Sequence, residues 1–356
     1  MRSLVLATYL LASIPFGGFL SAADQNDLST KHSALTPSPR PGGWMKRHES
    51  FNTKVKANQG NIDLAFIGDS ITQGWEGRGK VVWNTYYGHR KAINLGIGGD
   101  RTQHVLWRMD NGNLEGIEPK LAVIMIGTNN SANDRNTASE MVDGVRAVVT
   151  QLRSKLPQTK LLLLAIFPRG NKFNERRGKI LQVNQALSRL SDGEFVQFLD
   201  IGPHFMNDQG TISPSIMPDF LHLSTAGYGI WAESIESVVS RELGDRPMKA
   251  EPVNVDGEWR FEIEGPEGMA EATLEISANG PVLNGKIAFG PDRVLAFKSG
   301  GRFQDQIQLQ IVRDRPQGGT MTYNLTGTVK GDRISGKVST KFNDENVTLP
   351  WTAERR

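Results

Sequence analysis

Apolar runs alternate with amphipathic segments along the first two thirds of the chain. Near-continuous apolar runs are typical of strands that are buried on both faces, and five occur here: residues 62–67 (IDLAFI), 92–97 (AINLGI), 121–126 (LAVIMI), 160–167 (KLLLLAIF) and 195–201 (FVQFLDI). Segments with helical periodicity cover residues 137–156, 173–190 and 224–243. This alternation predicts a three-layer α/β domain with a five-stranded parallel sheet over residues 45–245.

The pattern changes in residues 255–356, where apolar and polar positions alternate with a period of two. Examples are WRFEIE (259–264) and QIQLQIV (306–312), and Asn-Gly and Gly-Asp turns separate such runs. This pattern predicts antiparallel strands and a second, all-β domain, either a small barrel or a sandwich. Trp259 and Trp351 are candidates for stacking on a sugar ring, although a tryptophan on a terminal strand more often belongs to a barrel core.

The amino-terminal segment has the layout of a secretory signal peptide. Residues 1–23 contain an early arginine, an apolar stretch and then small residues. Pro15 interrupts the apolar stretch well short of the ~20 residues that a membrane span needs. Residues 24–44 are rich in Ser, Thr, Pro and Gly, which predicts a flexible linker. We therefore expect an exported protein, periplasmic or extracellular, without stable membrane insertion.

Composition excludes several classes of function. The 41 basic and 38 acidic side chains are mixed along the chain, and no long basic run with aromatic residues occurs, so nucleic acid is not an expected partner. Because the chain has no cysteine, it has no disulfide, thiolate metal site or cysteine nucleophile.

Three of the predicted strands end in unusual loops, and ligands in α/β sheets bind at the carboxyl ends of the strands. The first strand ends at Ser70, whose hydroxyl would lie at the positive end of a helix dipole, although a simple N-cap is the alternative. The second ends in adjacent Gly98 and Gly99, which permit close backbone approach or form a tight turn. The third leads to Asn129, whose amide can stabilise an oxyanion or belong to a turn.

A carboxylate and an imidazole lie three residues apart before the last predicted helix. Asp219 and His222 occur in PDFLHLSTAGY (218–228), and one turn of chain brings them together. Such a contact fixes the histidine tautomer and raises the basicity of the ring. A lone histidine is usually structural, but here the three strand ends supply polar groups that suit it as partners.

Four segments, GDSIT (68–72), GIGGDRT (96–102), GTNN (127–130) and DFLH (219–222), resemble in this order the four blocks of the SGNH, or GDSL-type, hydrolase superfamily. The resemblance is closest to the catalytic subunits of platelet-activating factor acetylhydrolase, and it covers residues 45–245. It implies a flavodoxin-like fold and an enzyme that needs neither metal nor organic cofactor. The related subunits associate in pairs, which leaves a homodimer open.

The resemblance also assigns roles to individual residues. Ser70 is the expected nucleophile, His222 the general base and Asp219 the carboxylate that orients it. The expected oxyanion hole consists of the Ser70 N–H, the Gly99 N–H and the Asn129 side chain.

The resemblance implies a short-chain ester, expected to be an acetyl ester of a carbohydrate, because the closest family members remove acetyl groups and exported bacterial relatives are often carbohydrate esterases. Ile71 and Leu221 are candidate walls of a short acyl pocket. One alternative is a lysophospholipase, thioesterase or platelet-activating-factor-type acetylhydrolase acting on lipid. Another is a catalytically inert carbohydrate-binding protein. The carboxy-terminal domain resembles the calycin-like β domains of other exported enzymes.

Overall fold

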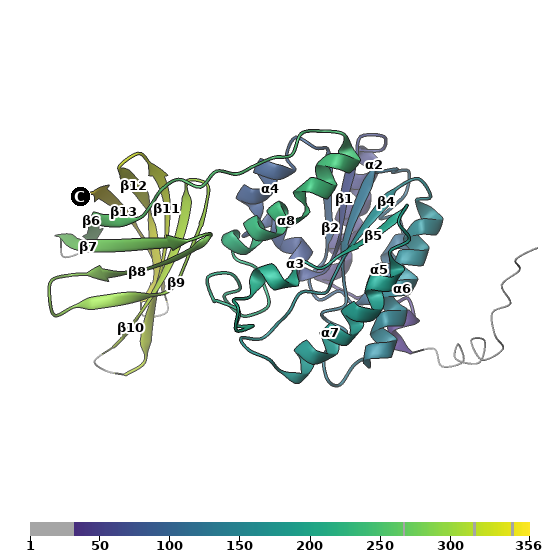
Figure 1. Cartoon of the computed structure of the whole chain (residues 1–356), viewed down its shortest axis with the longest axis horizontal. Coiled ribbons are helices and arrows are strands. Elements are labelled where there is room, and N and C mark those ends of the chain that lie inside the picture. Colours follow the sequence, from purple (N-terminus) through teal and green to yellow (C-terminus); the bar gives the residue numbers. More distant parts are fainter. Residues whose placement is uncertain (1–31, 266–267, 316–317, 343–344) are drawn as a thin grey trace, which may run out of the picture. The chain divides into compact units, whose positions relative to one another are not determined.

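The computed structural model describes residues 32–265, 268–315, 318–342 and 345–356 (Figure 1). The predicted signal peptide and the first part of the predicted linker lie outside these residues. No helix within the described part of the chain is long and apolar enough to cross a membrane.

A five-stranded parallel sheet forms the centre of the first domain. Its strand order is β2-β1-β3-β4-β5, with β1 (Leu64–Gly68), β2 (Ala92–Gly96), β3 (Leu121–Met125), β4 (Lys160–Leu164) and β5 (Val196–Leu199). All five residues of β1 and of β3 are buried, as expected for strands covered on both faces. The predicted fold class is confirmed.

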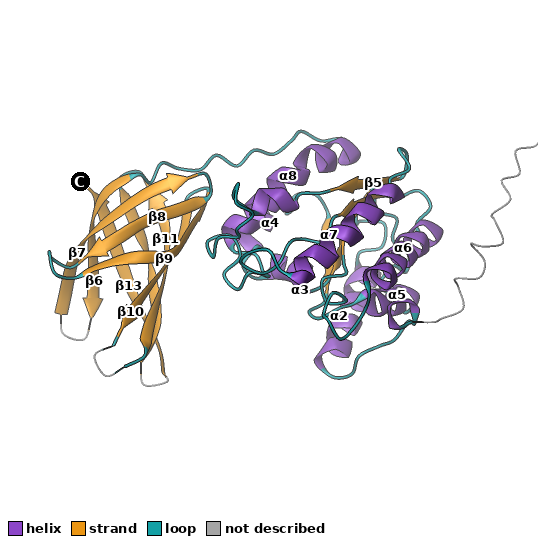
Figure 2. Ribbon diagram, turned by 60° about the horizontal axis from the view of Figure 1, so that its bottom comes forward, coloured by secondary structure: helices purple, strands orange, loops and turns teal. Residues whose placement is uncertain are grey.

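Helices cover both faces of this sheet (Figures 1 and 2). Side chains of β1 alternate between two hydrophobic clusters, so that Ala65 and Ile67 face one layer and Leu64 and Phe66 the other. The first layer contains α2 (Gly43–Ala57), α5 (Thr102–Asp110), α6 (Ala138–Lys155) and α7 (Glu175–Leu187). The second contains α3 (Ser70–Gln73), α4 (Lys80–Tyr86) and α8 (Thr225–Leu243).

Short 3-10 helices complete the described part of this domain, namely η2 (Ser33–Leu35), η3 (Gly74–Glu76), η4 (Ser188–Leu190) and η5 (Gly202–Phe205). The first of them lies within the range expected to be a flexible linker. There the structure differs from the expectation, because Ala34 is completely buried and its carbonyl accepts a hydrogen bond from Thr102 Oγ1 at 2.8 Å. The buried alanine is joined by a hydrogen bond from Asn136 Nδ2 to Ser33 Oγ at 3.1 Å, and composition does not reveal such contacts.

The second domain is a closed barrel of eight antiparallel strands. The strands are β6 (Gly257–Gly265), β7 (Gly268–Asn279), β8 (Val282–Ala288), β9 (Val294–Phe303), β10 (Gln306–Asp314), β11 (Thr320–Lys330), β12 (Arg333–Phe342) and β13 (Glu345–Arg355). Each pairs with its neighbour in sequence, and β13 closes the barrel against β6. Of the two expected architectures, the barrel is therefore the observed one.

Both tryptophans that we considered for sugar stacking lie inside the barrel. Trp259 is fully buried and Trp351 is 2% exposed, and both belong to the barrel's hydrophobic core. The Trp259 indole N–H donates to the Val255 carbonyl at 3.0 Å. Since no face of either ring is open to solvent, the core interpretation applies to both residues.

Candidate active site

The three motif-bearing strands are neighbours in the sheet. The chain passes from β1 to β2 on one side and then returns to β3 on the other side of β1. Such a reversal of strand order opens a crevice at the carboxyl ends of the strands. Ser70 and the loops after β2 and β3 therefore meet at one edge of the sheet.

Asp69, and not Ser70, caps helix α3. The Asp69 carboxylate accepts the Ile71 N–H at 2.9 Å, and Ser70 is the first residue of the helix. The N-cap interpretation of Ser70 therefore does not hold in this structure. Its hydroxyl is free to face the carboxyl edge of the sheet.

Ser70, His222 and Asp219 form a continuous hydrogen-bonded chain. Ser70 Oγ lies 2.9 Å from His222 Nε2, and His222 Nδ1 lies 2.7 Å from Asp219 Oδ2. Asp219 Oδ1 also accepts the backbone N–H groups of His222 at 2.7 Å and of Leu221 at 3.2 Å. Phe220 between them has a left-handed backbone (φ 57°), a conformation that lets this short loop fold back on itself. The structure thus brings together the three residues that the sequence indicated.

The Asp219 carboxylate is held in its charged form. Partial burial alone would raise its pKa, but the hydrogen bonds from the His222 ring and backbone outweigh burial and lower the pKa below the usual value. A charged Asp219 favours the His222 tautomer that has its proton on Nδ1 and leaves Nε2 to accept a proton from Ser70.

The expected oxyanion-hole donors lie on the loops around Ser70. Gly99 has φ 77°, a conformation that favours glycine. Within the described residues, neither the Ser70 N–H nor the Gly99 N–H has an acceptor. The Asn129 amide donates to the Asp100 carbonyl at 2.9 Å and lies 3.4 Å from Asp69 Oδ2. Asn129 is thereby held between the loop that carries Gly99 and the turn that carries Ser70.

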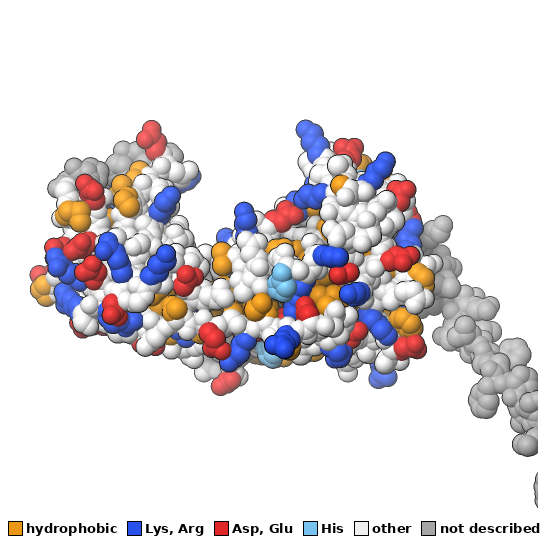
Figure 3. All heavy atoms as spheres, turned by 90° about the horizontal axis from the view of Figure 1, so that it is seen from above, with side chains coloured by type: hydrophobic (Ala, Val, Ile, Leu, Met, Phe, Trp, Pro, Cys, Tyr) orange, Lys and Arg blue, Asp and Glu red, His pale blue; other side chains and the backbone are white. Residues whose placement is uncertain are grey.

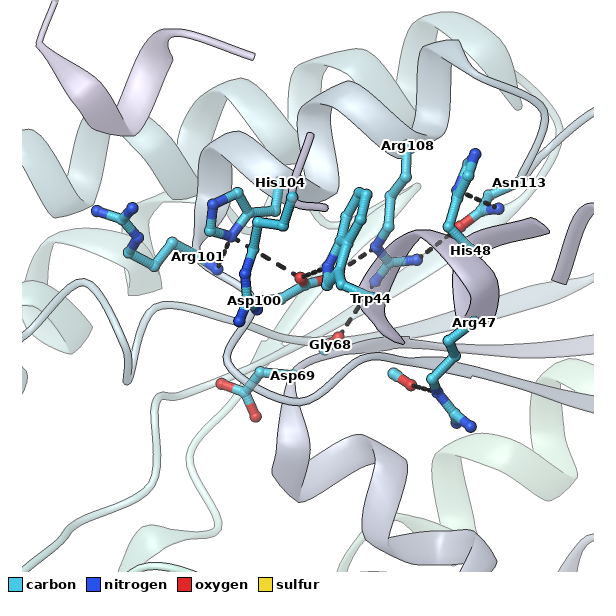
Figure 4. A network of polar contacts seen from close by, with 12 residues as sticks. Trp44, Arg47, His48, Gly68, Asp69, Asp100, Arg101, His104, Arg108 and Asn113 are labelled. Atoms are coloured by element: carbon cyan, nitrogen blue, oxygen red, sulfur yellow. Dashed lines mark hydrogen bonds and ion pairs between the residues drawn. The ribbon is translucent and has the colours of Figure 1, made fainter. Parts of the chain in front are cut away.

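A buried polar network supports these loops (Figure 4). The Asp100 side chain is fully buried, and it accepts hydrogen bonds from Trp44 Nε1 at 2.6 Å and from Arg108 Nε at 2.9 Å. Arg108 also donates to the Gly68 carbonyl at 3.1 Å. The network therefore ties the end of β1 to the loop after β2. We did not predict it from the sequence, where the only signal is an arginine among the apolar positions of HVLWRM (104–109).

Two further buried groups have strongly shifted pKa values. Burial raises the pKa of Asp69 to about 7, although its hydrogen bond from Ile71 opposes the shift. Burial and nearby arginines lower the pKa of His104 to about 3. His104 Nδ1 accepts the Arg101 N–H at 3.0 Å, so the ring is neutral and its 3.8 Å approach to Asp100 is not an ion pair.

The two candidate acyl-pocket residues lie in different surroundings. Leu221 is partly exposed and lines a pocket of about 550 Å³, together with Asp219 and Arg169. Ile71 is 1% exposed and belongs to the core between the sheet and α8. The structure therefore places Leu221 beside open space and Ile71 in core packing. No cluster of three or more His, Cys, Asp or Glu residues in the described part of the chain is arranged to hold a metal ion.

The chain shows clear similarity to known hydrolases. Residues 66–230 match the model of the GDSL-like lipase/acylhydrolase family. A stretch of 231 residues, 64% of this chain, is 37% identical to platelet-activating factor acetylhydrolase IB subunit alpha2 of Rattus norvegicus and covers 96% of that protein. This chain belongs to the GDSL-like lipase/acylhydrolase family. As a GDSL-like acylhydrolase it is a carboxylic ester hydrolase, which confirms the predicted family and enzyme class.

Other known proteins match a comparable share of this chain. The alpha1 subunit of the Homo sapiens enzyme is 37% identical over 213 residues, which are 60% of this chain and 89% of that protein. Among solved structures, a Streptococcus pneumonia protein described as a platelet activating factor has TM-score 0.46 and 24% identity, covering 55% of this chain and 94% of its own. The acetylxylan esterase Axe2 of Geobacillus stearothermophilus has TM-score 0.42 and 21% identity, covering 53% and 96%.

Proposed function

We propose that this protein is an exported serine esterase that removes acetyl and other short acyl groups from carbohydrate esters. The observation that carries the proposal is the chain of hydrogen bonds from Ser70 through His222 to Asp219, beside two backbone N–H groups that have no acceptor among the described residues. A nucleophile, a base within 2.9 Å and an orienting carboxylate are the parts that acyl transfer needs.

In the first half of the proposed reaction, Ser70 Oγ attacks the acyl carbonyl while His222 Nε2 takes its proton. Negative charge develops on the carbonyl oxygen, and the N–H groups of Ser70 and Gly99 stabilise it. Asn129 contributes the amide hydrogen that faces Asp69, because its 3.4 Å contact is the weaker of the two. Each such donor contributes on the order of 3 kcal/mol of transition-state stabilisation.

The tetrahedral intermediate then collapses. The imidazolium of His222 gives its proton to the leaving alcohol, and the acyl group stays on Ser70 as an ester. In the second half, His222 takes a proton from water, the hydroxide attacks the acyl carbon, and Ser70 leaves with the proton returned by His222. The charged Asp219 stabilises the imidazolium in both halves.

Three observations support the choice of substrate. The relatives that are 37% identical to this chain are named acetylhydrolases, which favours acetyl as the acyl group. Leu221 directly precedes His222 and lines a pocket with Asp219, which favours it as the side chain that limits acyl length. The signal-peptide pattern of residues 1–23 favours a compartment in which acetylated polysaccharides occur.

The test is hydrolysis of p-nitrophenyl acetate, butyrate and octanoate by the mature chain and by Ser70→Ala. We expect preference for acetate, and a loss of rate of roughly 10⁴- to 10⁶-fold in Ser70→Ala. Ser154→Ala, an exposed serine of α6, is the matched control and should keep the full rate. A Ser70→Ala variant that keeps a tenth of the activity would contradict the proposed mechanism.

The names of the mammalian relatives favour a second candidate, an acetylhydrolase that acts on lipid. Comparing the rates of deacetylation of an acetylated phospholipid and of acetylated xylan distinguishes a lipid alcohol from a carbohydrate alcohol. Preference for octanoate over acetate would instead indicate a lysophospholipase or a thioesterase.

A further inference from the structure

Three arginines gather at the loop that carries Gly99. Arg40 Nη1 donates to the Gly98 carbonyl at 2.9 Å, and a methyl group added at Gly99 would lie 2.8 Å from the same nitrogen. Arg135 Nη1 donates to the Asn129 carbonyl at 3.2 Å. Arg101 follows Asp100, and its guanidinium points away from that carboxylate (Figure 4). We call Arg40, Arg101 and Arg135 the arginine cluster.

The members of the arginine cluster lie close enough to repel one another. Burial lowers the pKa of Arg101, and the charges of Arg135 and Arg40 lower it further. His104 beside them is neutral and adds no charge of either sign. Like charges held together in this way destabilise the free protein, and a bound anion would remove that repulsion.

No carboxylate in the described part of the chain forms an ion pair with the arginine cluster. Asp100 is a nearby acidic group, but its two oxygens already accept hydrogen bonds from Trp44 and Arg108. Asp100 lies close enough to Arg40 to interact with its charge, whereas the charges that lower the pKa of Arg101 are those of two arginines. On the face seen in Figure 3, basic and acidic side chains are interspersed.

The place of this surplus charge connects it with the substrate. Arg40 binds the carbonyl of Gly98, the residue before the expected oxyanion donor Gly99. Arg135 binds the carbonyl of Asn129, which is itself an expected donor. These contacts place two of the arginines beside the loops whose N–H and amide groups are proposed to hold the ester oxygen. Guanidinium groups bind carboxylates and phosphates with paired hydrogen bonds, so they suit an anionic ligand.

We propose that the substrate is an ester whose alcohol part carries an anionic group, a carboxylate or a phosphate, bound by Arg40, Arg101 and Arg135. This inference rests on the esterase function proposed above and narrows its substrate class. Two sources supply the required charge, a uronate-type carboxylate in a polysaccharide and a phosphate ester.

Three matched acetyl esters test the proposal: 3-O-acetylglucose, 3-O-acetylglucuronate and 3-O-acetylglucose 6-phosphate. We expect kcat/KM at low ionic strength to be about tenfold higher for at least one anionic ester than for the neutral one. The advantage should shrink as salt screens the charges. Preference for glucuronate identifies a carboxylate source, and preference for the phosphate identifies the other; equal rates on all three esters would overturn the proposal.

Variants then assign the preference to the arginine cluster. Arg101→Gln and Arg135→Gln should lower the ratio of kcat/KM for the anionic ester to that for the neutral one toward unity. Arg189→Gln, an exposed arginine of η4, is the control and should keep the wild-type ratio. Arg135 is exposed, so its variant serves even if Arg101→Gln folds poorly. An equal loss on both esters would mean that these arginines do not select charge, and would overturn the assignment.

The experiments can refute this inference and the proposed function separately. Hydrolysis of neutral p-nitrophenyl acetate that depends on Ser70 but shows no preference for anionic esters would refute the inference alone. Hydrolysis that does not depend on Ser70 would refute the proposed esterase mechanism.

Discussion

The two sides of Ser70 differ sharply in their exposure to water. On one side, the side chains of His222 and Asp219 are 37% and 53% exposed. On the other side, those of Arg108 and Asp100, which support the Gly99 loop, are 1% and 0% exposed. The proposed base and the carboxylate that orients it are thus open to solvent. The side chains that position the proposed oxyanion donors are buried.

This difference predicts separable effects of substitution. An exposed ion pair contributes little to folding stability, typically about 0–1 kcal/mol. Removing one partner of a buried ion pair leaves an uncompensated charge in the interior and destabilises strongly. Substitutions on the exposed side should therefore change the rate alone, and substitutions on the buried side should change stability first.

Asp219→Asn should have the largest effect and change the rate almost exclusively. The amide still accepts the backbone N–H of His222 but no longer stabilises the imidazolium, so kcat should fall by about 10²- to 10⁴-fold. The free energy of unfolding should change by less than about 1 kcal/mol. Hydrolysis of p-nitrophenyl acetate and urea unfolding measure the two quantities, with the exposed Asp208→Asn as control. A large loss of stability would show that this side of the site also supports the fold.

Arg108→Met should instead act mainly on folding stability. The unfolding free energy should fall by about 3–5 kcal/mol, because Asp100 stays buried without its charged partner. Urea unfolding measures the change. The double variant Arg108→Met with Asp100→Asn should recover part of the loss, since the buried charge is gone. If the double variant is as unstable as the single one, lost packing and not the unpaired charge is the cause.

Asp69→Asn should change how stability depends on pH. Because the folded pKa of Asp69 is raised from its ordinary value of 3.8 to about 7, its contribution is fully favourable below pH 3.8 and is lost as the pH rises through 7. The wild type should thus lose up to about 4 kcal/mol relative to Asp69→Asn between pH 4 and pH 8. Urea unfolding at several pH values measures this difference. Parallel pH profiles for the two proteins would contradict it.

Trp44→Phe should have the smallest effect of the series. It removes the indole donor from Asp100 but keeps an aromatic ring against His48, with which Trp44 stacks. We expect a loss of about 2 kcal/mol in unfolding free energy, the usual contribution of a hydrogen bond to a charged group. Thermal unfolding would detect this loss, and an unchanged midpoint would show that Arg108 alone satisfies Asp100.

The sequence was informative wherever function is concentrated in short motifs at strand ends. His222 lies within hydrogen-bonding distance of both Ser70 and Asp219, as their motifs indicated. The parallel sheet followed from its apolar runs, because strands buried on both faces have a simple pattern.

What the sequence did not reveal depends on contacts between distant segments. Trp44 and Arg40 come from a stretch that looks like a linker, yet they contact Asp100 and Gly98 more than 50 residues away. Ile71 directly follows Ser70 but turns into the core. No local pattern distinguishes these cases, because side-chain direction and tertiary docking decide them.

The capping of helix α3 by Asp69 has a practical consequence. Because the Asp69 carboxylate caps the helix, the Ser70 hydroxyl can be removed without disturbing the start of the helix. The alanine variant should therefore work as a substrate trap, a folded protein that retains an intact ester long enough for its alcohol to be identified. Position 70 can therefore be substituted while the helix that presents it stays in place.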